Sequence, residues 1–136
     1  MISKSVLFVL ALLCGAMPQA IAQQPSSESR PGAVLQGLDK ITARISTFEA
    51  PIGEPVRFGT FDITVRACYR TPPTEPPESM AFLEVFDNRH DGTQLEAFSG
   101  WMFASSPALS AMEHPVYDVW VVDCMKDSSA SPSSSG

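Results

Sequence analysis

The feature that most constrains the fold is a run from Phe61 to Arg70 in which apolar and polar side chains alternate. The apolar positions are Phe61, Ile63, Val65, Ala67 and Tyr69, and the intervening ones are Asp62, Thr64, Arg66, Cys68 and Arg70. Successive side chains of a β-strand point to opposite faces, so the pattern predicts a strand with one buried and one solvent-facing side. It places Cys68 on the polar side, where a disulfide would join the outer face or a strand end.

Other short apolar runs are separated by proline and glycine and show no helical periodicity, which favours further strands. We expect them at Ile41–Ala50, Val56–Phe58, Met80–Phe86, Leu95–Phe103 and Val116–Cys124. Ile41, Ala43 and Ile45 would form the apolar side of the first strand. Met80–Phe86 is apolar at almost every position, which suggests burial on both faces. Turns are expected at Pro51–Gly53 and Asp91–Gly92.

Two segments lack strand character. Thr71–Glu78 is rich in proline and predicts a stiff crossover between strands, with recognition by an aromatic groove as the alternative. Pro107–His114 could hold a helical turn. The fold class predicted from these patterns is all-β, a small antiparallel β-sandwich or barrel with at most one short helix and a single disulfide.

The first residues, Met1–Ala22, have the pattern of a secretory signal peptide. Lys4 is followed by the apolar run Val6–Leu13 and by the small-residue cleavage site Ala20-Ile21-Ala22. The apolar run is too short for a membrane-spanning helix, which needs roughly 20 apolar residues, so no anchor is expected after cleavage. Lipidation at Cys14 is a minor alternative, disfavoured by the large residue that precedes it.

Cleavage would leave a flexible leader at residues 23–32, a single β domain at 33–126 and a serine-rich disordered tail at 127–136. The full chain has a net charge of −6, and loss of Lys4 with the signal peptide makes the net charge of the remaining chain one unit more negative. A ligand with a phosphate backbone needs a basic patch, so nucleic acid is an unexpected partner.

Cys68 and Cys124 would be the remaining cysteines, and an oxidising compartment predicts that they pair. A redox-active pair would normally lie in a local C-x-x-C motif.

Two groups of polar residues suggest chemistry. Ser105, Ser106, His114 and Asp118 include the residue types of a serine hydrolase, although the nucleophile motif G-x-S-x-G is absent and Ser-Ser-Pro is typical of a helix N-terminus. Asp87, His90, Asp91 and His114 could be metal ligands, but their spacing fits neither a zinc site nor an EF-hand, and a solvated turn is preferred. We therefore predict no catalytic residue, no metal and no cofactor.

Aromatic side chains are densest in the last third of the chain. Trp101, Phe103, Tyr117 and Trp120 are candidate partner-binding residues, because alternation alone does not place both tryptophans in the core. Tryptophan on a surface is a frequent anchor of binding interfaces. The sequence alone does not assign each of these rings to the core or to the surface.

The segments Phe98–Pro107 and Glu113–Cys124, with Leu38–Arg44, Pro55–Phe61 and Ala67–Pro73, resemble a family of exported envelope proteins of alphaproteobacteria, domain of unknown function 2155. The resemblance covers nearly the whole folded body. It implies an exported single-domain protein with cysteines at positions 68 and 124, and no activity that can be assigned to particular residues. We expect a non-enzymatic periplasmic binding or assembly module whose partner is another envelope component. A small envelope hydrolase using Ser106, His114 and Asp118 is the alternative.

Overall fold

The computed structural model describes residue 15 and residues 27–127. Most of the predicted signal peptide, including Cys14, and nearly all of the tail lie outside the described residues. The elements in chain order are β1 (Glu28–Ser29), β2 (Gly32–Asp39), β3 (Arg44–Pro51), β4 (Val56–Phe58), β5 (Phe61–Arg70), β6 (Ser79–Asn88), β7 (Gln94–Phe103), the 3₁₀ helix η1 (Pro107–Ser110) and β8 (Tyr117–Cys124).

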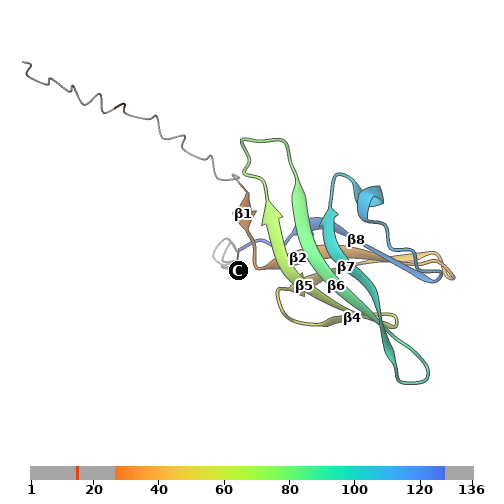
Figure 1. Cartoon of the computed structure of the whole chain (residues 1–136). Helices are drawn as coiled ribbons and strands as arrows, with labels where there is room; N and C mark the ends of the chain where they lie inside the picture. Colours follow the sequence, from red (N-terminus) through yellow and green to blue (C-terminus); the bar gives the residue numbers. More distant parts are fainter. Residues whose placement is uncertain (1–14, 16–26, 128–136) are drawn as a thin grey trace, which may run out of the picture.

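The strands form two antiparallel sheets packed face to face (Figure 1). In the larger sheet β5, β6 and β7 are consecutive, and the short strands β1 and β4 both pair with the outer edge of β5. The smaller sheet has the order β3-β2-β8. Side chains from both inner faces make the core, the largest being Phe61, Leu35, Ile63, Leu83 and Met102. The predicted all-β antiparallel fold with one short helix is confirmed, in the form of a β-sandwich.

The first predicted strand, Ile41–Ala50, is wrong at its start. Residues 40–43 form the turn of a hairpin between β2 and β3, and β2 itself was not predicted. The Asp39 side chain accepts hydrogen bonds from the backbone N–H groups of Ile41 and Thr42, which is the aspartate turn that ends a strand. Ile41 and Ile45 are 76% and 59% exposed, so they form no apolar inner face. Alternation was mistaken here for burial.

The predicted flexible leader, residues 23–32, is wrong for its last residues. Glu28 and Ser29 pair with Arg70 and Tyr69 of β5, and Gly32 already belongs to β2. Glu28 and Ser29 are exposed and bury little of their own surface. Their order comes from backbone hydrogen bonds to the edge of β5, which the local composition does not reveal.

The predicted orientation of Cys68 is also wrong. A register shift between Val65 and Ala67, a β-bulge, reverses the faces of the last part of β5. Cys68 therefore points into the core and is fully buried, whereas Tyr69 points outward. The cysteine meets Cys124 of β8 at a Cα–Cα distance of 5.9 Å, so the disulfide joins the two sheets through the core.

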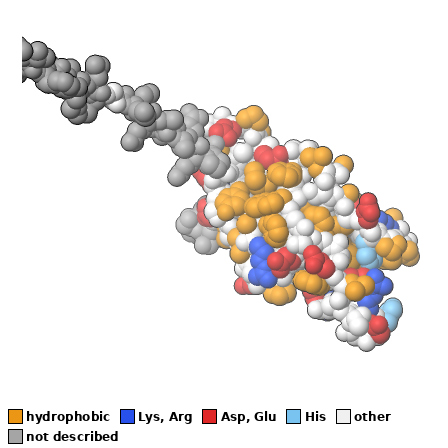
Figure 2. Space-filling view, in the orientation of Figure 1, with side chains coloured by type: hydrophobic (Ala, Val, Ile, Leu, Met, Phe, Trp, Pro, Cys, Tyr) orange, Lys and Arg blue, Asp and Glu red, His pale blue; other side chains and the backbone are white. Residues whose placement is uncertain are grey.

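The sequence suggested that the strand at Met80–Phe86 is buried on both faces. The structure shows that β6 is buried on one face only. Its inward residues Ala81, Leu83 and Val85 are fully buried, while Met80 and Phe82 on the other face remain partly exposed. No third layer covers this outer face in the described part of the chain. Figure 2 shows apolar side chains gathered on the surface over the β5–β6–β7 sheet.

The proline-rich segment Thr71–Glu78 connects β5 to β6 outside the ladder, as predicted, and is closed by a hydrogen bond from the Thr71 N–H to the Glu78 carbonyl (3.0 Å). Among the described residues, no helix has the length and apolar character needed to cross a membrane.

Candidate binding face

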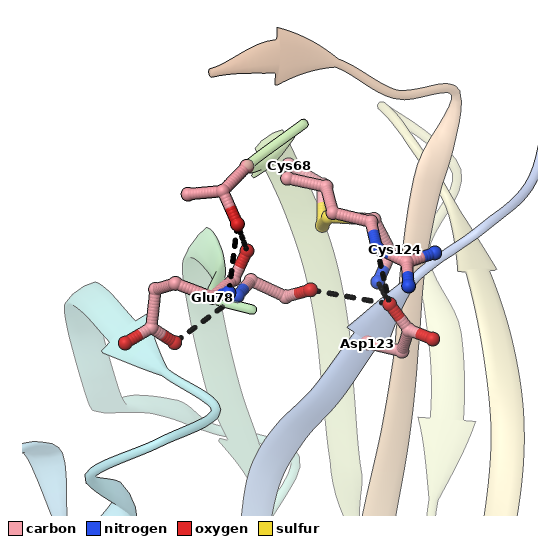
Figure 3. The surroundings of a disulfide bond; sticks show 7 residues. Cys68, Glu78, Asp123 and Cys124 are labelled. Carbon is pink, nitrogen blue, oxygen red and sulfur yellow. Dashed lines mark hydrogen bonds and ion pairs between the residues drawn. A yellow bond between two sulfur atoms is a disulfide. The ribbon is translucent and has the colours of Figure 1, made fainter. Parts of the chain in front are cut away.

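A polar network surrounds the disulfide where the two sheets meet (Figure 3). The Ser79 hydroxyl donates to Asp123 (3.1 Å), and the backbone N–H of Cys124 donates to the same carboxylate oxygen (2.8 Å). Glu78 accepts hydrogen bonds from the backbone N–H groups of Ser79 and Ser105 and from the Ser105 hydroxyl. Cys68 and Cys124 are 0% and 3% exposed. Thiol exchange needs access to a sulfur atom, so this bridge has the setting of a structural crosslink.

The structure does not assemble the hydrolase triad. His114 Nδ1 accepts hydrogen bonds from the backbone N–H groups of Val116 and Tyr117 (both 3.1 Å). This leaves the proton on Nε2, which donates to Asp87 Oδ2 (3.0 Å). Both ring nitrogens are therefore occupied, and neither can take a proton from a nucleophile. Among the described residues no hydrogen bond joins Ser106, His114 and Asp118 to one another.

The Asp87–His114 pair instead fastens the segment before β8 to the end of β6. Asp87 is 6% exposed and also accepts a hydrogen bond from the Thr60 hydroxyl (2.5 Å). Burial raises the pKa of the Asp87 carboxyl, but hydrogen bonds from Thr60 and His114 and the nearby charge of Arg89 outweigh it, so the pKa lies below its ordinary value. The pair is a buried, satisfied structural contact.

The other candidate ligands do not join this pair. Asp91 accepts hydrogen bonds from the Thr93 N–H and hydroxyl within the β6–β7 turn, and His90 is exposed on the same turn. Within the described residues no group of three or more His, Cys, Asp or Glu side chains is placed to hold a metal ion.

The most distinctive surface is an aromatic strip on the outer face of the β5–β6–β7 sheet. We use this name for five side chains from three neighbouring strands: Tyr69, Met80, Phe82, Trp101 and Phe103. Met80 stands opposite Tyr69 on one side and Phe103 on the other, and Phe82 stands opposite Trp101. The Trp101 ring packs edge-on against the Phe82 ring, with 5.5 Å between the ring centroids, and its centroid lies 6.1 Å from that of the Tyr69 ring. The strip is a continuous apolar surface on rigid strands.

The strip is bordered by polar groups along the strands. One step further along the face, Glu84 of β6 stands opposite Ser99 of β7 and forms an ion pair with Arg66 of β5 (3.1 Å). Trp101 is 40% exposed, and the other four side chains of the strip are partly buried. An apolar patch with a polar rim is typical of interaction sites.

The four aromatic residues singled out in the sequence take three different positions. Trp101 and Phe103 belong to the strip. Tyr117 faces inward and packs against Phe58 and Phe61. Trp120 lies on the outer face of the other sheet, where its indole N–H donates to Gln36 (3.2 Å).

Sequence reasoning missed the other three members of the strip. Tyr69 was assigned to the inner face because the bulge in β5 leaves no mark on the alternation. Met80 and Phe82 were assigned to a strand buried on both sides. The useful signal was the pairing of that apolar strand with a neighbour containing tryptophan, since a central strand of a two-layer sandwich always has one face without a covering sheet.

These observations define a class: a small two-sheet β-sandwich, bridged through its core by one disulfide and carrying an open aromatic face. The chain belongs to the family described as "Uncharacterized protein conserved in bacteria (DUF2155)", whose model matches residues 33–124. The resemblance found in the sequence is thereby confirmed. Uncharacterized protein RP359 of Rickettsia prowazekii (strain Madrid E) is 30% identical over 87 residues, which are 64% of this chain and 56% of that protein. The match thus spans little more than half of that relative. No solved structure matches the chain.

Proposed function

We propose that this protein is a non-enzymatic binding or assembly module of the bacterial envelope, which contacts another envelope protein through the aromatic strip. The single observation that supports this function is the open cluster of Tyr69, Phe82 and Trp101 on a rigid sheet. Tryptophan and tyrosine lose little conformational entropy on binding and dominate the energy of many interfaces.

The shape of the face supports a protein partner. Small-molecule sites are concave, and four clefts among the described residues are lined by side chains other than Tyr69, Phe82 and Trp101. A flat apolar face with a polar border matches the core and rim of a protein–protein interface. A second copy of this chain is disfavoured, because two acidic molecules repel each other.

The proposed location is the periplasm, after cleavage behind Ala22. This rests on the signal-peptide pattern of Met1–Ala22 and on the disulfide between Cys68 and Cys124, which persists in oxidising compartments.

Site-specific photocrosslinking in intact cells tests the function. A photoreactive residue at Tyr69 or Phe82 is expected to give an adduct of one defined mass. The adduct should disappear when Trp101→Ala is added, and it should survive Trp120→Ala, a matched loss of tryptophan on the opposite sheet. A photoreactive residue at Glu49, exposed on β3, is the control position.

Adducts of equal yield from Glu49, or adducts unaffected by Trp101→Ala, would show that the strip is not the interface. Absence of any adduct from both Tyr69 and Phe82 would also contradict the proposal.

A further inference from the structure

A second surface, separate from the aromatic strip, lies along the free edge of β7. Strand β7 pairs with β6 on one side. On its other side, within the described residues, the Ser110 hydroxyl donates to the Trp101 carbonyl (2.6 Å), so η1 covers that end of the strand. From Gln94 to Ser99 the edge has no other hydrogen-bonding partner among them. This open stretch is about 20 Å long, enough to pair with an extended segment of roughly six residues.

The open edge borders a cleft of about 650 Å³, which is within the range of ligand-binding clefts. Leu95 and Ala97 line it on the β7 side, and Pro115 and Val116 line it on the side that leads into β8. Because β7 and β8 are edge strands of different sheets, the cleft lies at the seam where the sandwich is not closed. Leu95 is 48% exposed and so offers apolar surface to an incoming chain.

The unpaired charge of the cleft is negative. Asp87 and His114, which also line the cleft, are hydrogen-bonded to each other. Arg89 forms an ion pair with Asp87, with 3.8 Å between Nε and Oδ2. Glu96 and Glu113 are exposed and form no ion pair with any described residue. The basic side chains near them are those of His90 on the β6–β7 turn and of Lys40, which lies outside the cleft lining and donates from Nζ to the His114 carbonyl (2.6 Å). A chain that fits this cleft would therefore contain Lys or Arg.

We propose that this cleft binds an extended, basic segment of another protein, which adds as a strand to the edge of β7 between Gln94 and Ser99. Main-chain hydrogen bonds to β7 would hold the segment, and every second side chain would face the apolar wall formed by Leu95 and Ala97. Lys or Arg residues of the segment would pair with Glu96 and Glu113.

The chain's own ends do not match this chemistry. Residues 16–26 and 128–136 contain no Lys or Arg. The described part of the chain also begins and ends at the side of the sandwich away from the β6–β7 turn (Figure 1). A separate protein is therefore the proposed source of the segment.

Peptide selection tests the proposal. The mature chain, immobilised, is used to select from a displayed library of random peptides about 12 residues long, roughly twice the length of the open edge. The expected winners alternate apolar residues with Lys or Arg. As synthetic peptides they should slow amide hydrogen exchange at Gln94–Ser99. Glu96→Lys combined with Glu113→Lys should weaken their binding about ten-fold or more.

Two matched variants make the result specific. Glu49→Lys with Glu54→Lys makes the same change of charge at exposed positions of β3 and of the loop that follows it, and should alter affinity less than about two-fold. Trp101→Ala should leave peptide binding unchanged, which separates this site from the aromatic strip. Leu95→Arg, at a half-exposed position that should tolerate it, is expected to weaken binding as strongly as the double lysine variant.

The proposal would be overturned by no enrichment over an uncoated surface, by equal loss of affinity in both double lysine variants, or by slowed exchange at the β3 edge in place of β7. A peptide that requires Trp101 would assign peptide binding to the strip, and would also overturn it.

Discussion

Replacing Cys68 and Cys124 together by alanine is expected to lower the free energy of unfolding by about 4 kcal/mol. The two cysteines are 56 positions apart in the sequence, and closing a loop of that length removes about 4 kcal/mol of chain entropy from the unfolded state. Small domains are stable by only about 5–15 kcal/mol, so the variant should lose roughly a quarter to four-fifths of its stability. For a domain of roughly 100 residues this corresponds to a fall in Tm of about 20 °C.

The assay is urea unfolding of the mature chain and of the double alanine variant, followed by tryptophan fluorescence and circular dichroism. If the bridge acts on the unfolded state, its removal should also raise the m value, because an unconstrained chain exposes more surface on unfolding. The wild-type mature chain, which lacks Cys14, should have no reactive thiol before reduction. Because Cys68 and Cys124 are buried, a mild reductant should open the bridge only when a denaturant is present.

A loss of less than about 1 kcal/mol with an unchanged m value would refute the chain-entropy argument for this bridge. Two alkylated cysteines in unreduced, exported protein would refute the disulfide itself. The double alanine variant treated with reductant is the control, since its stability should not respond.

Three further predictions concern the core, the turns and the export signal. Asp87→Asn should lower the free energy of unfolding by about 1–3 kcal/mol at pH 7, because it weakens buried hydrogen bonds. Since the folded-state pKa of Asp87 is lowered, its stabilising contribution is present above about pH 4 and is lost as the pH falls through that pKa; in urea unfolding at pH 2–5 the stability of the variant should therefore fall less steeply with acid than that of the wild type. Gly59→Ala should destabilise by about 2–5 kcal/mol in thermal unfolding, since both its positive φ of 57° and the ring of Tyr117 oppose a Cβ, whereas Gly92→Ala, with a φ of 84° and open space, should lose only about 1–2 kcal/mol; equal losses would show that the ring contact is unimportant. Mass spectrometry of the exported chain should find an N-terminus at Gln23, and a lipid-modified N-terminus would contradict cleavage at that position.

Much of the fold was predictable because β-strands have a period of two residues and short apolar runs separated by proline and glycine are typical of them. The strand at Phe61–Arg70 agrees with β5, and the turn at Asp91–Gly92 falls between β6 and β7. Strand β2 was missed because its sequence, with two glycines and few polar residues, has little alternation. It is a strand because β3 and β8 pair with it on both sides.

The candidate site was less predictable. Trp101 and Phe103 were identified, but Tyr69 was assigned to the wrong face, since a bulge shifts every later side chain of a strand and leaves the sequence pattern intact. Met80 and Phe82 were expected in a strand buried on both sides. The hydrolase alternative likewise depended on residues that are close in the sequence. The partner of His114 is Asp87, which lies 27 positions away and is brought near by the packing of β6.

By itself, the sequence determined the fold class, the pairing of the two cysteines and membership of the family, because period, composition and characteristic sequence blocks are local or one-dimensional properties. Only the tertiary structure decided which face of β5 contains Cys68, which aromatic rings are open to solvent and where an edge remains unpaired. Those properties depend on strand register and on which layers cover one another. Both are set by contacts between residues far apart in the chain, so no local pattern encodes them.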